Sequence, residues 1–325
     1  MSDIRSRLAV VMDPIASIHY AKDSTLAMLL AAQARGFELL YLEQSDLSLK
    51  DGRALGRIRP LAVRADPASW FTLGEARLEP LASCDCILMR KDPPFEMEYI
   101  YTTYVLERAE AEGSLVVNRP QGLRDMNEKV YTAWFPQCCA PTLVTRDMAA
   151  MHAFLGVEGK IVCKPLHGMG GRSIFVLESA DKNAGVVFET LTDYGRRFAI
   201  VQRYLPQIAE SGDARVLLID GEPVPYALAR IPGPHDHRGN LAAGARGVGR
   251  PLEERDRWLA REIGPALAAR GMLFVGLDVI GGYVTEINVT SPTGIRELDK
   301  QFHTDIGGLL IAAIERRLDG SRTRL

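Results

Sequence analysis

In the first third of the chain, short apolar runs alternate with helical patterns, and this alternation restricts the fold more than any other feature. Two amphipathic stretches, Ser24-Arg35 and Tyr99-Glu112, predict helices that end at Gly36 and Gly113. The apolar runs that predict strands are Leu8-Met12, Glu38-Leu42, Cys86-Met89 and Leu115-Val117. Strands that alternate with helices form a mostly parallel sheet with helices on its faces. An α/β fold is therefore expected for this region.

Polar residues follow three of these predicted strands: Asp13, Arg90-Lys91-Asp92 and Asn118-Arg119. In parallel sheets, ligands bind beyond the carboxyl ends of the strands. Each segment alone is also consistent with an ordinary polar loop, but the three together favour a pocket. Arg90 is the candidate for holding a substrate carboxylate, because its guanidinium can donate two parallel hydrogen bonds.

The chain between 122 and 134 is read as a crossing into a second unit, in which few long helices are expected between Lys160 and Arg230. The predicted strands there are Thr142-Val144, Ile161-Lys164, Ser173-Leu177, Ala199-Tyr204, Arg215-Ile219 and Val224-Ala229. This section is therefore expected to be largely antiparallel. The segment Ile231-Gly247 has neither the hydrophobic period of a helix nor that of a strand, so it is expected to be a functional lid or disordered. Helices are predicted at Glu253-Arg270 and Asp305-Leu318.

The stretch LDVIGGYVTEIN, Leu277 to Asn288, predicts two strands joined at Gly281-Gly282. Glu286 and Asn288 share one face, because side chains alternate along a strand. A two-residue turn would place Asp278 opposite Thr285, on the other face. A three-residue turn would place Asp278 opposite Glu286, and both turn lengths are common.

In the second register, two carboxylates stand about 5 Å apart at Cβ and repel unless a cation lies between them. Gly276 would face Asn288 and leave open space beside these oxygens. Carboxylate and amide oxygens suit Mg²⁺, which completes its shell with water and phosphate. The alternative is a surface hairpin with a solvated acidic face.

A lysine and a glycine-rich turn lie together in VCKPLHGMGGRS, Val162 to Ser173. Glycines let backbone N–H groups approach phosphate oxygens, and Lys164 is placed to reach the same anion. A plain hairpin turn would look much the same. Arg215 and Arg230 each lie near the end of an apolar strand, so each needs a partner, either an acidic side chain or a phosphate. Lys129 alone is read as a solvated helix residue.

The bulk composition is that of a soluble globular protein, with 325 residues, 47% hydrophobic content and a net charge of −2. Two or three packed units are expected at this length. The charge gives no general attraction to nucleic acid or to an anionic membrane. Five cysteines without C-x-x-C spacing predict a reducing cytoplasm and buried thiols. His235-x-His237 lacks a third ligand nearby, and there is no HExxH or GxSxG motif.

Several motifs together resemble the prokaryotic glutathione synthetases of the ATP-grasp superfamily, over nearly the whole chain. The long C-terminal motif is the most specific of them. The matching segments are Val11-Ile15, Met89-Phe95, Asn118-Lys129, Lys164-Phe175, Leu228-Pro232, Arg238-Gly244 and Phe274-Glu297.

The resemblance implies an α/β (α+β) fold with three parts: a Rossmann-like parallel-sheet domain (1–123), an ATP-grasp lid domain (124–200) and a C-terminal ATP-grasp domain (201–325) with a flexible loop at 231–247. It also implies ligation of γ-glutamylcysteine with glycine by ATP, through an acyl phosphate, with two Mg²⁺ ions or Mn²⁺ in their place. No nucleic acid or membrane partner is expected, and a cytoplasmic homotetramer is implied.

Roles for single residues also follow from the resemblance. The metal ions would be held by Asp278, Glu286 and Asn288, and the transferred phosphoryl group by Arg215, Arg230 and Arg238. The nucleotide would be held by Lys129, Lys164, Gly168, Gly170, Gly171, Ser173, Gln202, Tyr204, Leu205 and Asp213. The substrates would be held by Arg90, Asp13, Ser291 and Thr293.

Two other functions are consistent with the same residues. One is a different ATP-grasp carboxylate–amine ligase, such as one that extends a peptide with glutamate. The other is a non-enzymatic ATP-binding regulator. A regulator needs the phosphate-binding turn but not a second metal position, so the full residue set argues against it.

Overall fold

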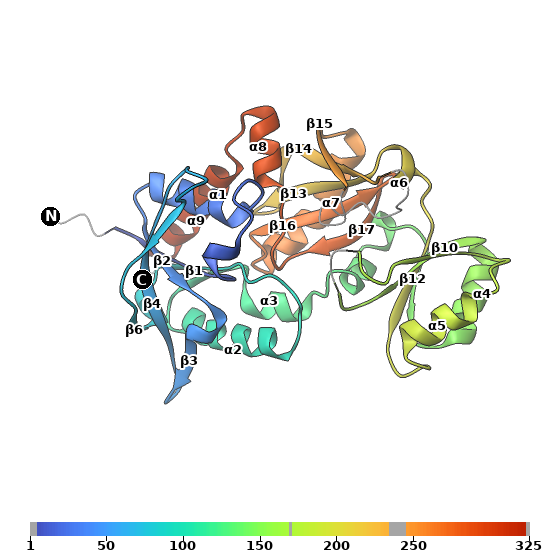
Figure 1. The fold of residues 1–325 in the computed structure, drawn as a ribbon, viewed down its shortest axis with the longest axis horizontal. Coiled ribbons are helices and arrows are strands. Elements are labelled where there is room, and N and C mark those ends of the chain that lie inside the picture. Colours follow the sequence, from blue (N-terminus) through green and yellow to red (C-terminus); the bar gives the residue numbers. More distant parts are fainter. Residues whose placement is uncertain (1–4, 169–170, 234–244, 323–325) are drawn as a thin grey trace.

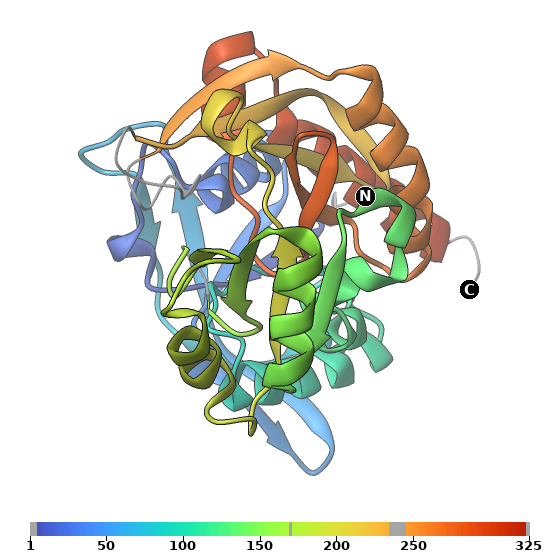
Figure 2. The same ribbon diagram turned by 90° about the vertical axis from the view of Figure 1, so that its right-hand side faces the viewer.

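The structure is a computed structural model that describes residues 5–168, 171–233 and 245–322 of the chain. Three sheets lie along the long axis of the molecule (Figure 1). The N-terminal sheet lies at one end, the C-terminal sheet in the middle and a smaller sheet at the other end. Figure 2 views the molecule from the side of this smaller sheet. No helix among the described residues is long and apolar enough to cross a membrane.

The predicted parallel strands form the centre of the N-terminal sheet. β1 (Arg7–Val11) lies between β2 (Glu38–Leu42) and β7 (Cys86–Met89), and β8 (Leu115–Val117) follows β7, all in parallel. Helices α1 (Ser24–Ala34) and α2 (Met97–Ala111) begin and end close to the predicted residues. The short α3 (Pro120–Asp125) leads out of the sheet.

An antiparallel extension of this sheet was not predicted. β4 (Arg53–Val63) pairs with β2 and with three further strands, β3 (Leu47–Lys50), β5 (Phe71–Leu73) and β6 (Arg77–Pro80). Along β4, exposed and buried residues alternate. Such a strand, with one solvated face, carries no continuous apolar run. The sheet is therefore mixed, with a parallel centre.

The smaller sheet is antiparallel, as predicted, and has a core of its own. Its strands are β11 (Phe175–Glu178), β10 (Lys160–Pro165), β12 (Ala199–Arg203) and β9 (Thr142–Thr145), in that order. Two helices that were not predicted, α4 (Met148–Glu158) and α5 (Ala184–Thr192), pack against it. Phe188, which is fully buried, belongs to this core.

The C-terminal sheet is antiparallel, and its central strand pairs carry the chemically interesting residues. The strand order is β15 (Arg246–Pro251), β14 (Glu222–Ile231), β13 (Asp213–Ile219), β16 (Phe274–Ile280) and β17 (Tyr283–Asn288). The accompanying helices are α6 (Gln207–Glu210), α7 (Glu254–Ala269), α8 (Ile295–Phe302) and α9 (Ile306–Arg322).

Both ends of the segment 231–247, predicted to have no regular structure, belong to strands. Ile231 ends β14, and Arg246 and Gly247 belong to β15, which pairs with β14. The glycine-rich composition concealed this strand, because glycine has little strand propensity. Residues 234–244, which include His235 and His237, lie outside the described residues.

The N-terminal and C-terminal sheets share one continuous core. The side chains of α1 and α9 pack together in a buried cluster that also contains β1 and β16 residues. Asn118 links the same two parts, because its Nδ2 donates to Phe274 O and Val289 O, at 2.7 Å each. Asn118, expected at a pocket, is buried and lines a small cavity beside Arg90, where it also links the two parts. Arg119 is exposed and pairs with Glu110.

Candidate functional site

The β16–β17 hairpin combines features of both predicted registers. Ile280 pairs with Tyr283, so the turn has two residues, Gly281 and Gly282, with φ of 55° and 79°. Positive φ at both positions is the geometry of a type I′ turn. The register then shifts by one residue, and Asp278 still pairs with Glu286. A β-bulge at Thr285 supplies the extra residue, which neither predicted register contained. Asp278 and Glu286 therefore lie opposite each other on the two strands of the hairpin.

Two arginines share the Asp278 carboxylate. Arg215 Nε lies 2.5 Å from Asp278 Oδ1, and an Arg230 guanidinium nitrogen lies 2.8 Å from Oδ2. All three side chains are almost fully buried. Burial alone would raise the pKa of Asp278, but the two guanidinium groups outweigh it and hold this pKa below its usual range. The partner of both arginines is thus an acidic side chain in this structure.

Gly276 faces Asn288 as predicted, but the space beside it is filled. A Cβ at Gly276 would lie 2.7 Å from Arg215 Cδ and 3.0 Å from Pro292 Cβ. The expectation of open space beside the oxygens was wrong, because Arg215 crosses over the glycine to reach Asp278. The missing side chain at position 276 makes this crossing possible.

Asp213 begins β13 and continues the chain of charges. Arg230 donates to Asp213 Oδ2 at 2.5 Å, whereas Asp213 Oδ1 is buried without a hydrogen-bond partner. Burial raises the pKa of Asp213 to about 6, and the negative charge of Asp278 adds to this effect, although Arg230 opposes both. An acceptor left free in a buried position is suited to a ligand hydroxyl.

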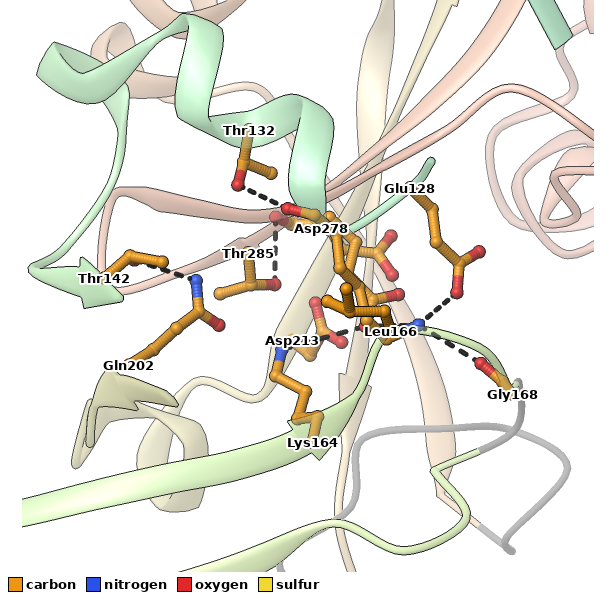
Figure 3. Close-up of polar contacts among 12 residues, drawn as sticks. Glu128, Thr132, Thr142, Lys164, Leu166, Gly168, Gln202, Asp213, Asp278 and Thr285 are labelled. Atoms are coloured by element: carbon orange, nitrogen blue, oxygen red, sulfur yellow. Dashed lines mark hydrogen bonds and ion pairs between the residues drawn. The ribbon is translucent and has the colours of Figure 1, made fainter. Parts of the chain in front are cut away.

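Two lysines approach Glu286 from different elements. The ammonium groups of Lys129 and Lys164 each lie 3.7 Å from Glu286 Oε1. Lys129 is 4% exposed, so its interpretation as a solvated helix residue was wrong. It also pairs with Glu128, whose carboxylate points into the site (Figure 3). Burial tends to lower the pKa of Lys129, but Glu286 and Glu128 outweigh it and raise this pKa.

The glycine-rich turn lies over the same lysines. Lys129 Nζ donates to Gly168 O at 3.1 Å, and Lys164 extends from β10 toward the centre of the site (Figure 3). Gly168, Gly171 and Ser173 all have positive φ. Gly168 and Gly171 line the resulting cleft. Gly170 and Arg238, both predicted at the site, lie outside the described residues.

A mainly apolar pocket continues from the charged cleft between the smaller sheet and the hairpin. The two cavities share Lys164, Ile174, Asp278 and Glu286. The pocket is lined by four residues that the family resemblance assigned to the nucleotide: Gln202, Tyr204, Leu205 and Asp213. Its apolar walls include Val162, Ile174, Val176, Ile280 and Val284, which sequence reasoning missed. Their strand positions were predicted, but aliphatic side chains look the same in a pocket wall and in a core.

Two of the four residues predicted to hold substrates line the cleft, and the other two do not. Ser291 and Thr293 line the cleft. Arg90 does not line it and is 6% exposed, because it donates to Thr25 Oγ1 and Pro292 O, at 3.1 and 3.0 Å. Asp13 lies at a separate open hollow, where it accepts from Asp92 N and pairs with Lys91.

The donor set at the hairpin fits a hard divalent cation. Asp278, Glu286 and Asn288 offer oxygen atoms on two paired strands, Asp278 opposite Glu286 and Asn288 opposite Gly276. Among the described residues there is no group of three histidine, cysteine or acidic side chains that could hold a metal alone. A cation here would therefore need further ligands from a bound anion or water. The five cysteines are free, and all but Cys139 are buried, as predicted.

Comparison with known proteins connects this cleft to one family. Residues 7–124 match the family model of the prokaryotic glutathione synthetase N-terminal domain, and residues 128–303 match that of its ATP-grasp domain. Glutathione synthetase of Pseudomonas putida is 60% identical over 96% of this chain and 98% of its own length. That of Salmonella typhimurium is 55% identical over 96% and 99%.

Solved structures with the same fold are more distant in sequence. The D-cycloserine synthetase DcsG has a TM-score of 0.69 at 17% identity and covers 96% of this chain and all of its own. The ATP-grasp ligase PsnB, complexed with a minimal precursor, has a TM-score of 0.63 at 18% identity, over 96% and 99%. These neighbours establish the ATP-grasp fold. With the two family models and the near full-length relatives, they show that the chain belongs to the prokaryotic glutathione synthetases, which are ATP-grasp ligases.

Proposed function

We propose that this chain joins γ-glutamylcysteine to glycine and converts ATP to ADP and phosphate, through an acyl phosphate formed in the cleft. The observation that carries this proposal is the joint position of Asp278 and Glu286 opposite each other, with two lysines and two arginines around them. This combination suits phosphoryl transfer, which depends on positioning and on neutralising charge.

The nucleotide would lie across both cavities. In this proposal the apolar pocket takes the adenine, with Gln202, Tyr204 and Leu205 along its edge. The free Oδ1 of Asp213 accepts from a ribose hydroxyl. The phosphates reach the charged cleft, where Lys129 and Lys164 contact them and the turn at Gly168 and Gly171 offers backbone N–H groups. Ser173, which was also expected to hold the nucleotide, does not line the cleft.

Asp278, Glu286 and Asn288 would hold two Mg²⁺ ions, or Mn²⁺ in their place. Bound there, the metal would neutralise negative charge on the transferred group. Because Asp278 already accepts from Arg215 and Arg230, nucleotide binding must redistribute these contacts. We propose that the guanidinium groups then also donate to the transferred phosphoryl group, so that positive charge is in place before the reaction.

The reaction has two steps. A carboxylate oxygen of the cysteinyl residue attacks the γ-phosphorus, and ADP leaves. The glycine amine, after losing a proton, attacks the acyl carbon, and phosphate leaves with the bonding electrons. The acyl phosphate reacts readily with water, so the site must exclude water until glycine attacks.

Ser291 and Thr293 are proposed to contact the substrates directly, since both line the cleft. For Arg90 we propose a supporting role, because its guanidinium donates to the backbone of the Ser291–Thr293 segment. Asp13 would act at a distance, through Lys91 and the backbone of Asp92, which lines the cleft.

The domain boundaries, the location and the assembly are further parts of the proposal. Boundaries at 123/124 and 200/201 are supported by the separate core of the smaller sheet, although β12 crosses the second boundary. Five free thiols support a cytoplasmic location. A homotetramer is proposed from the family resemblance.

Phosphate release in the presence of γ-glutamylcysteine, with and without glycine, tests the proposal. Steady release that requires glycine and matches glutathione formation one to one is expected. Release supported instead by another amine or acid would favour a different carboxylate–amine ligase. No release with any pair of substrates would favour a regulator that only binds ATP.

A further inference from the structure

Eight charged groups in and beside the cleft form two linked chains with no net charge. Asp92 and Arg172, which also line the cleft, carry opposite charges. In the first chain, Lys129 contacts both Glu128 and Glu286, and Lys164 contacts Glu286. In the second, Arg230 joins Asp213 to Asp278, which also binds Arg215. Four cationic groups are thus matched by four carboxylates. Glu128 is the one carboxylate of this set to which neither the predicted metal site nor the predicted nucleotide site gives a role.

The position of Glu128 is fixed by its backbone and by its neighbours. Its carbonyl oxygen accepts from Ile287 N at 2.8 Å, which attaches it to the strand that carries Glu286 and Asn288. Asn127 Nδ2 donates to Leu166 O at 3.2 Å, at the start of the glycine-rich turn. The Glu128 side chain is 21% exposed and lines the cleft. Its carboxylate therefore lies between the proposed metal strand and the proposed phosphate turn.

We propose that Glu128 makes nucleotide binding depend on divalent metal. This inference rests on the proposed function, in which the cleft holds the phosphates of ATP. Since the cleft is neutral, an ATP molecule with about four negative charges gains no net attraction, and Glu128 repels it directly. ATP that carries two divalent ions has little net charge and avoids this repulsion. Glu128 thus favours the metal-loaded nucleotide and rejects the free one.

Substituting the carboxylate by a neutral amide isolates this effect. Glu128→Gln keeps the side-chain size and the backbone bond to Ile287, but leaves Lys129 with one carboxylate fewer. The affinity for metal-free nucleotide should rise by about tenfold, because one repulsive charge near the phosphates is removed. The affinity with Mg²⁺ should change by less than about threefold. The metal-dependence ratio, which is the dissociation constant without metal divided by that with Mg²⁺, should therefore fall about tenfold.

The experiment is calorimetric titration of the full chain with a non-hydrolysable ATP analogue, once with excess EDTA and once with saturating Mg²⁺. Glu128→Asp retains the charge and should keep the wild-type ratio. Glu107→Gln removes an acidic group that pairs with Arg124 on α2 and α3, outside the cleft, and should also leave the ratio unchanged. The melting temperature of each variant identifies any loss of folding.

Each outcome has a distinct meaning. A ratio that falls for Glu128→Gln alone supports the inference. An unchanged ratio, or equal weakening of both affinities, overturns it and reduces Glu128 to a structural residue. If the ratio falls as much for Glu128→Asp, which keeps the charge, as for Glu128→Gln, the charge of Glu128 is not the cause and the inference is overturned. If the wild-type chain binds no nucleotide even with Mg²⁺, the proposed function itself fails, which is a different result from failure at Glu128.

Discussion

Asp278 is the residue on which most of the site's geometry depends. Arg215 donates to both of its oxygens, Arg230 also contacts Oδ2, and its strand neighbour across the hairpin is Glu286. The sequence predicted that Asp278, Arg215 and Arg230 belong to the site, but it left open what the arginines would pair with. That choice depends on the register of three neighbouring strands, which residue types do not specify.

Replacing Gly276 by alanine tests the contact between Arg215 and Asp278. The new Cβ would lie 2.7 Å from Arg215 Cδ, so the arginine must move away from the carboxylate. We expect kcat to fall by about tenfold or more. The free energy of unfolding should fall by about 1–3 kcal/mol. Chemical unfolding and steady-state kinetics measure these effects.

Gly156→Ala is the matched control, because Gly156 lies in α4 and an added Cβ there would meet nothing within 4 Å. It should leave kcat unchanged and raise the unfolding free energy by up to about 1 kcal/mol. Equal kcat values for wild type and Gly276→Ala would show that Arg215 need not reach Asp278.

The raised pKa of Asp213 predicts a pH-dependent difference in stability between the wild type and Asp213→Asn. Burial, with Asp278 and Glu286 nearby, raises this pKa from 3.8 to about 6 in the folded chain, against the opposing effect of Arg230. Between these values the folded state binds more protons than the unfolded state, so stability falls as pH rises. Relative to Asp213→Asn, the wild type should lose about 2–3 kcal/mol between pH 4 and pH 6.

Urea unfolding of both proteins across this pH range measures the difference. Asp213→Asn also removes one of the two carboxylate partners of Arg230, which changes the free energy of unfolding by a pH-independent amount. Only the slope of the difference against pH therefore reports on the pKa. A difference that stays flat between pH 4 and pH 6 would show that Asp213 has an ordinary pKa in the folded chain.

At the scale of elements, the sequence predicted most of the strands near the site but not how they join. Two apolar runs joined by a pair of glycines indicated the β16–β17 hairpin and its turn. The bulge at Thr285 was missed, because a bulge adds a residue without changing the composition of the strand. Glu128 was missed for a related reason: its importance comes from the bond between its backbone and β17, which no local pattern indicates.

The turn at Gly281 offers a test of whether the hairpin geometry controls activity. Its φ of 55° lies in the left-handed region, which asparagine tolerates and β-branched residues avoid. Gly281→Val should lower the unfolding free energy by about 1–2 kcal/mol. It should also reduce kcat, because it displaces the strands that carry Asp278 and Glu286.

Gly281→Asn is the control of similar size, and it should retain most of the stability and activity. The two variants share any contact with Gln207, which lies beside this turn. If both variants lose activity to the same extent, crowding at the turn, rather than backbone conformation, is responsible.

At the scale of the whole molecule, the smaller sheet stands apart from the rest. Its core contains only residues from 151–201, whereas the N-terminal and C-terminal sheets share two larger clusters. The sequence predicted three parts, but it did not indicate that the first and third are fused through α1 and α9. That fusion depends on contacts between chain ends about 280 residues apart, such as the pair of Arg35 and Glu315.

This division predicts that the smaller sheet opens as a unit. Phe188→Ala removes the largest side chain of its core at a cost of about 3–5 kcal/mol. Hydrogen exchange should become faster in β10 and β12 and stay unchanged in β1 and β13. Leu310→Ala, in the shared core, should show the reverse pattern. Faster exchange everywhere in Phe188→Ala would mean that the molecule unfolds as one unit.

The central claim is that the hairpin residues and the lysines hold a metal-loaded nucleotide between the smaller sheet and the C-terminal sheet. Anomalous diffraction from crystals grown with Mn²⁺ and a non-hydrolysable ATP analogue tests it most directly. The account predicts manganese peaks at about 2.0–2.4 Å from oxygens of Asp278, Glu286 and Asn288, with the phosphates beside Lys129 and Lys164. Bound nucleotide with no manganese peak near either carboxylate would contradict the account.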